Sequence, residues 1–157
     1  MLTSRRDYLL RIIDEVSRLL ARAFLKRREG ETEAALHTVV QASERLFNLE
    51  AHELFQFTPE QQFLMLTEGA EPDDARAKVL IYAALNLEAG RSYAALKKPE
   101  LARGSWINAL RFTCRAHVSF PTDTPPDYAP RIPELLTLLA DEPLDPDTAA
   151  LVRAATN

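Results

Sequence analysis

The sequence predicts an all-α protein, and three observations support this prediction. Residues that favour helices, chiefly alanine, leucine, glutamate and arginine, are abundant, whereas strand-favouring residues are sparse. Apolar residues recur at spacings of three and four along much of the chain. Prolines, capping residues and glycines divide the chain into helix-sized segments. With 157 residues, the chain can bury the core of one ordinary domain.

The first segment predicts a long amphipathic helix over residues 5–28. Gly30 ends it, and the basic cluster at residues 26–28 complements the helix dipole near that end. The helix has polar residues between apolar positions spaced by three and four residues. These apolar positions are Leu9, Ile12, Ile13, Val16, Leu19, Leu20 and Ala23.

The second segment, from Glu31 to Leu49, predicts a helix with apolar residues on two faces. One face carries Ala35, Val39 and Ala42, and a second stripe includes Leu36, Val40 and Phe47. A helix that is apolar on two faces lies between neighbours, as helices do in stacked arrays.

Three further helices are predicted in the middle of the chain, over residues 58–67, 71–96 and 98–118. Thr58 followed by Pro59 and Gln61 is typical of a capped helix start. Acidic residues open the next helix, and a Lys-Pro-Glu sequence at residues 98–100 separates it from the third.

The composition changes after residue 120. Five prolines fall between Pro121 and Pro133, which predicts an extended connector over residues 121–133. Two short helices, over residues 132–140 and from Asp145 onwards, follow the change. We therefore expect a helical domain over residues 1–120 and two C-terminal capping helices within 134–157 that cover the end of the same domain. The alternative is a mobile C-terminal tail.

Residues 83–110 carry small and bulky side chains at recurrent positions. Gly90, Ala102 and Ala109 are small where two antiparallel helices would approach, and Tyr93 and Trp106 are bulky. In this pattern the segment resembles one helix-turn-helix unit of the tetratricopeptide repeat (TPR) family. The resemblance implies antiparallel helical hairpins stacked as a short right-handed array, with a long N-terminal helix and short C-terminal capping helices.

A weaker copy of the pattern lies 67 residues earlier. Gly30, Ala35, Val39 and Ala42 correspond there to Lys97, Ala102, Trp106 and Ala109, and twice the family period is about 68 residues. The chain departs from the family at the turn, where glycine is usual and Lys97 stands. It departs again at Asn86, where a large apolar residue is usual. An unrelated helical bundle is the alternative, because such residues occur at helical spacing in any bundle.

The resemblance also implies a function. Repeat proteins of this kind bind a peptide or helix along the first helix of each pair, so we expect a non-enzymatic, bacterial-type interaction or scaffold module. Arg91 is the expected anchor for a partner's carboxylate. The groove residues that the resemblance implies are Ala84, Leu87, Glu88, Arg91, Ala94 and Ala95.

The sequence contains no recognisable catalytic constellation, cofactor motif or metal-ligand pattern. The acidic pairs, such as Glu50 with Glu53, sit near predicted helix starts, where the dipole accounts for them. Cys114 and His117 are three residues apart in a helix, and a small sensor or catalytic bundle with a pocket around them is the alternative function.

Charge is unevenly distributed along the chain. Residues 1–30 contain eight basic and four acidic residues, a net charge of +4, so the remainder carries −8 of the total of −4. Such asymmetry can direct self-association, and a homodimer formed through the N-terminal helix is one expectation. A pI near 5.4 argues against nucleic-acid binding.

The single cysteine, with no signal peptide or membrane span expected, indicates a cytoplasmic protein without a membrane partner.

Overall fold

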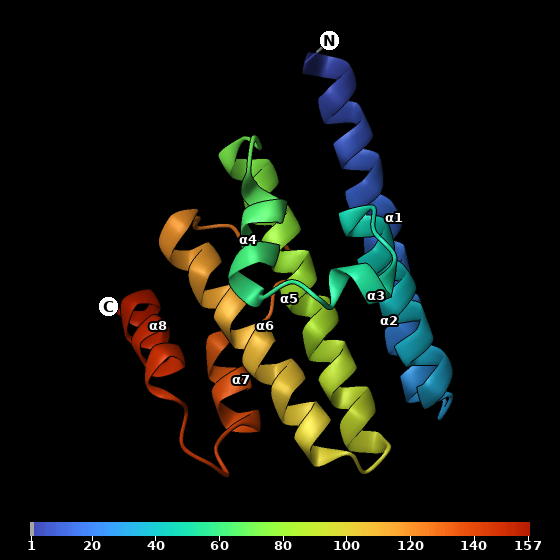
Figure 1. Cartoon of the computed structure of the whole chain (residues 1–157), viewed down its shortest axis with the longest axis vertical. Coiled ribbons are helices and arrows are strands. Elements are labelled where there is room, and N and C mark those ends of the chain that lie inside the picture. Colours follow the sequence, from blue (N-terminus) through green and yellow to red (C-terminus); the bar gives the residue numbers. More distant parts are fainter. Residues whose placement is uncertain (1) are drawn as a thin grey trace.

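The computed structural model describes residues 2–157, and side chains from residue 5 onwards. Over this range the chain forms helices and connecting segments, with no strands, which confirms the all-α prediction. Figure 1 shows their arrangement. The helices are α1 (Leu2–Arg28), α2 (Thr32–Phe47), α3 (Ala51–Leu54), α4 (Pro59–Thr67), α5 (Pro72–Ala95), α6 (Pro99–Ser119), α7 (Ile132–Leu138) and α8 (Pro146–Thr156).

Two long antiparallel hairpins form the body of the molecule (Figure 1). The first is α1 with α2, and the second is α5 with α6. Helix α5 lies at the centre and contacts α1, α2, α4 and α6, while α7 and α8 pack against α6. The C-terminal helices therefore cover the side of the second hairpin that faces away from the first.

The second hairpin is held by a close approach at Gly90. A Cβ atom built on Gly90 would lie 2.3 Å from Nε1 of Trp106, so only glycine fits beneath this indole. Ala102 and Ala109 on α6 are also buried. Small residues on both helices thus let the two backbones come together, with one large side chain filling the gap.

The core has two parts. The larger lies among α1, α2, α4, α5 and α6, where side chains such as Val16, Leu85 and Phe112 are buried. The smaller joins α6 to the C-terminal helices through Leu110, Leu135 and their neighbours. Burial of these apolar surfaces supplies most of the stabilisation.

Left-handed residues end several helices. Gly30 follows α1 with φ 86° and Gly69 follows α4 with φ 72°, a conformation that glycine adopts without steric cost. Asn48 ends α2 with φ 54°, and Lys97 lies in the α5–α6 turn with φ 61°. Asparagine tolerates this conformation, whereas lysine adopts it at a cost.

The predicted helices agree with the observed ones to within a few residues at each end. Helix α2 ends at Phe47 rather than Leu49 because Asn48 turns left-handed. The four-residue α3 was not predicted, and residues 121–131 lie outside helices, as the proline content indicates. Within residues 2–157 no helix combines the length and apolarity required to cross a membrane.

Candidate functional site

A cleft of about 280 Å³ opens between α2, α5 and α6. Its fourth side is formed by the start of α4 and by residues 48–58, which include α3 and which we call the spacer. We call this cleft the central cleft. It is lined by Leu36, Val39, Val40 and Ser43 of α2; Phe55, Phe57, Pro59 and Gln62 of the spacer and α4; Tyr82, Leu85, Asn86, Ala89 and Tyr93 of α5; and Ser105 and Asn108 of α6.

Tyr82 is the best-buried aromatic side chain of the lining. Its ring meets Phe47 and Phe112 edge-on, with ring centroids 4.8 and 5.0 Å away, a geometry that aromatic pairs favour. Burial raises the pKa of Tyr82 to about 12. The phenol therefore stays neutral at physiological pH and acts as a hydrogen-bonding group.

Gln62 fixes the spacer wall of the cleft to α5. Its buried amide donates a hydrogen bond to the carbonyl of Leu54 at 3.2 Å and accepts one from the hydroxyl of Tyr82 at 3.2 Å. A capping box starts the helix that carries it: Thr58 Oγ1 accepts from the backbone N–H of Gln61, whose side chain accepts from the backbone N–H of Thr58. The turn chemistry of residues 58–61 thus determines where Gln62 points.

Two aromatic side chains of the spacer line the cleft and remain largely open to solvent. Phe55 is 59% exposed and Phe57 is 39% exposed. Single exposed apolar residues are common, but two large ones beside a cleft mark a surface suited to binding.

The polar groups of the cleft are neutral. Ser43 and Asn86 donate to main-chain carbonyls of their own helices, at 3.0 and 2.9 Å. Ser105 and Asn108 are half-buried, and in the described part of the chain their side chains form no hydrogen bond. The lining residues contain no carboxylate, imidazole, thiol or amine. The described lining therefore offers apolar contact and hydrogen bonds rather than acid–base chemistry.

The groove expected along α5 is largely interior in this structure. Ala84, Leu87 and Glu88 are all buried. Leu87 packs in the C-terminal core with Ile132 and Leu135 of α7. Glu88 forms an ion pair with Arg27 of α1, whose side chain is also largely covered.

The other three expected groove residues lie nearer the end of α5. Arg91 forms an ion pair with Glu134 of α7, so its guanidinium is engaged within the chain. Ala94 and Ala95 are exposed. Helix α7 and the end of α1 thus occupy the face of α5 where the sequence suggested an open groove. They supply the apolar contacts of Leu87 and the ion-pair partners of Glu88 and Arg91.

Cys114 and His117 do not form a reactive pair in this structure. The thiol is completely buried, and burial raises its pKa to about 11, which disfavours the nucleophilic thiolate. His117 is exposed, and its Nδ1 lies 2.9 Å from the main-chain carbonyl oxygen of Thr113. These positions give no support to the sensor or catalytic alternative.

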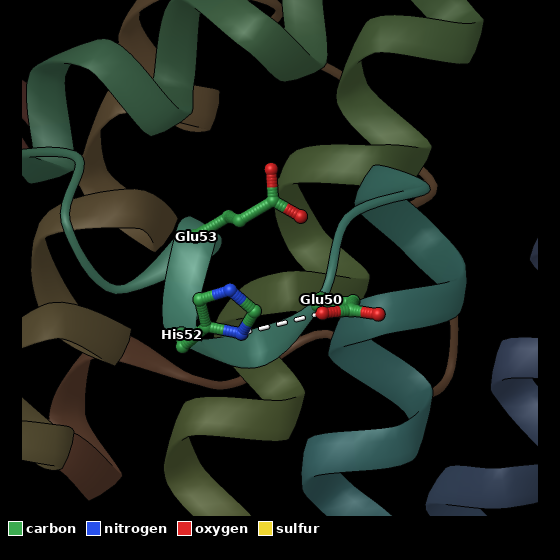
Figure 2. Close-up of side chains that lie close together, drawn as sticks. All are labelled: Glu50, His52 and Glu53. Atoms are coloured by element: carbon green, nitrogen blue, oxygen red, sulfur yellow. Dashed lines mark ion pairs between the residues drawn. The ribbon is translucent and has the colours of Figure 1, made fainter.

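A second group of polar side chains gathers at α3 (Figure 2). Glu50, His52 and Glu53 bring ligand-type atoms within 4.8 Å of one another, and His52 Nδ1 lies 3.4 Å from Glu50. All three side chains are exposed. We assign no metal to this cluster, because acidic residues also stabilise the start of a helix without one.

Comparison with known proteins identifies no relative of this chain. No protein-family model, no curated protein and no solved structure matches this chain. The functional conclusion therefore depends on the geometry of the cleft and on the residues themselves.

Proposed function

We propose that this protein is a non-enzymatic, TPR-like interaction module that holds apolar side chains of a peptide or helix in the central cleft. The observation that carries the proposal is the cleft itself: about 280 Å³, without charged lining residues in the described chain, and flanked by two exposed phenylalanines.

Corresponding positions in the two hairpins support the TPR-like part of the proposal. Ala35 and Ala42 of α2 are fully buried, as are Ala102 and Ala109 of α6, 67 residues later. Gly30 and Lys97, also 67 residues apart, both have positive φ in the turns that join their hairpins. The same small positions and the same turn geometry thus recur at about twice the family period.

The size of the cleft favours a peptide over a small organic ligand. Drug-sized ligands occupy cavities of roughly 300–1,000 Å³, whereas the central cleft is at the lower limit of this range and open on one side. One or two apolar side chains would fill it, and the free amide of Asn108 and hydroxyl of Ser105 could then hydrogen-bond to a peptide main chain. Such an anchor-in-pocket arrangement is how interfaces concentrate their affinity.

Peptide selection tests this function with two matched variants of α6. Peptides are selected from a random library on the wild-type protein, and the best are titrated by calorimetry. Ser105→Phe places a ring in the cleft without removing a hydrogen bond between described residues. Gly104→Phe places the same ring on the adjacent exposed position, where an added Cβ meets nothing within 4 Å.

We expect selected peptides to share large apolar residues. Ser105→Phe should weaken their binding by at least about tenfold, while Gly104→Phe leaves it unchanged. If Ser105→Phe unfolds the protein, Leu36→Lys on the opposite wall replaces it. A library that yields no binder, or binders that tolerate every cleft substitution, would contradict the proposal.

A further inference from the structure

The N-terminal part of α1 extends beyond its partner helix. Helix α2 runs antiparallel to α1, and Arg45 near its end pairs with Glu15 at 2.6 Å. The N-terminal end of α1 therefore projects past α2, as Figure 1 shows. We call residues 5–11 the α1 overhang.

A wide cleft of about 710 Å³ separates the α1 overhang from the turn between α4 and α5. Residues 5–9 form one wall, residues 68–74 form the other, and Lys78 completes the lining. On the overhang, Tyr8 and Leu10 are each 50% exposed. The overhang thus presents apolar surface that its own chain leaves uncovered.

The two walls carry opposite charge. The turn side contributes the exposed Glu68, Glu71 and Asp73 and the buried Asp74 beside Lys78, whereas the overhang contributes Arg5 and Arg6 with the single acid Asp7. Among the described residues, the ion pairs include no partner for Arg5, Arg6 or Arg11, and of the four acids only Asp73 is paired, with Arg76. Each chain therefore offers a basic helix end and an acidic turn side by side.

We propose that the occupant of this cleft is the α1 overhang of a second copy of the chain. Two overhangs related by a twofold axis would each lie in the other's cleft, with the arginines of one copy facing the acidic turn of the other. Such an arrangement is self-complementary and closes as a dimer. Residues 1–30 carry a net charge of +4 and the remainder of the chain −8, so the N-terminal segment of one copy is attracted to the rest of the other. The proposal is independent of what the central cleft binds.

The acidic wall selects this occupant over other candidates. A nucleic-acid backbone or an anionic lipid surface would approach Arg5 and Arg6 but would meet the carboxylates of the turn at the same time. The overhang of a second copy carries two kinds of surface: its arginines suit the acidic turn, and its exposed Tyr8 and Leu10 can pack against the same residues of the first overhang.

Sedimentation over a wide concentration range tests the proposal. The wild-type chain should dimerise, and raising the salt from about 0.05 M to about 0.5 M should weaken the dimer because the contacts are exposed charge pairs. Arg6→Glu and Glu71→Lys should each weaken homodimers by at least about tenfold, since each places like charges opposite one another. Arg22→Glu makes the same charge change at an exposed position of α1 outside the overhang and should have no effect.

Mixing the two charge-reversed chains gives the sharpest result. In an Arg6→Glu chain paired with a Glu71→Lys chain, both overhang–turn contacts become complementary again. We expect the mixture to form a heterodimer while each variant alone stays monomeric. A wild-type chain that is monomeric throughout, a dimer indifferent to both substitutions, or a mixture that fails to associate would each overturn the proposal.

Discussion

Helices α1 and α5 have similar lengths, 27 and 24 residues, but very different surroundings. Thirteen residues of α5 are buried, whereas between residues 5 and 28 only Ile12, Val16 and Ala23 of α1 are. Helix α5 has neighbours on several sides, and α1 lies at the edge of the molecule, where it contacts α2 and α5. The central helix is therefore held on most sides, whereas the edge helix keeps an exposed face.

The contrast predicts a large difference in thiol reactivity. Cys114 on α6 is buried in the smaller core, which α6 shares with α7, and burial raises its pKa to about 11. Its reaction with a thiol reagent near pH 8 should be slower by roughly a thousandfold than that of a cysteine introduced at exposed Leu10, because it requires opening of the fold. Reaction rates of the wild type and of a Leu10→Cys, Cys114→Ser variant measure this. Equal rates would show that the C-terminal side of the molecule is open.

Truncating one leucine on each helix compares the two environments directly. Leu85 of α5 is completely buried and Leu10 of α1 is half exposed. Leu85→Ala should lower the free energy of unfolding by about 3 kcal/mol through lost burial and a cavity. Leu10→Ala should change it by less than about 0.5 kcal/mol. Denaturant titration gives both values, and similar losses would mean that α1 is packed as tightly as α5.

The ion pair between Arg27 and Glu88 connects the two helices. Arg27→Ala leaves the carboxylate of Glu88, whose side chain is 5% exposed, without its partner, and we expect a loss of about 2 kcal/mol. Arg45→Ala, which removes the more exposed partner of Glu15, should have little effect, as surface ion pairs usually do. The double variant Arg27→Ala, Glu88→Leu should recover much of the loss. Failure to recover it would show that Arg27 acts by packing rather than by charge.

The two hairpin turns allow a smaller, reciprocal test. Lys97 has φ 61° in the α5–α6 turn and Gly30 has φ 86° after α1. Lys97→Gly removes left-handed strain and should stabilise the fold by about 0.5–1 kcal/mol. Gly30→Lys introduces the same strain and should destabilise by a similar amount. Thermal unfolding of both variants checks the signs, and two changes of the same sign would contradict the equivalence of the turns.

The sequence was sufficient to predict the long helices because their signals are local. A proline occupies the first turn of four helices: Pro59, Pro72, Pro99 and Pro146. Proline is tolerated there but not in the interior of a helix. The short α3 could not be predicted in the same way. The first backbone N–H of α3, that of Ala51, donates a hydrogen bond to the carboxylate of Glu44 in α2, at 2.9 Å. The start of α3 therefore depends on a residue of another helix.

The candidate sites depend on contacts between distant residues, which the sequence pattern does not contain. In the central cleft, Gln62 joins Leu54 to Tyr82, two residues that are distant from each other in the sequence. The resemblance to the repeat family implied that Glu88 lines a groove, and a glutamate on a helix is usually exposed. Its burial follows from Arg27, 61 positions earlier.

The close approach of α5 and α6 is the central structural claim, because Gly90 and Trp106 adjoin Ala89 and Ser105 in the wall of the cleft. Measuring Gly90→Ala in two backgrounds tests it. In the wild type, the added methyl group meets the indole and should destabilise the protein by about 2 kcal/mol or more. In a Trp106→Ala background the space is open, and the same substitution should stabilise the helix by up to about 1 kcal/mol. A loss of the same size in both backgrounds would contradict the account.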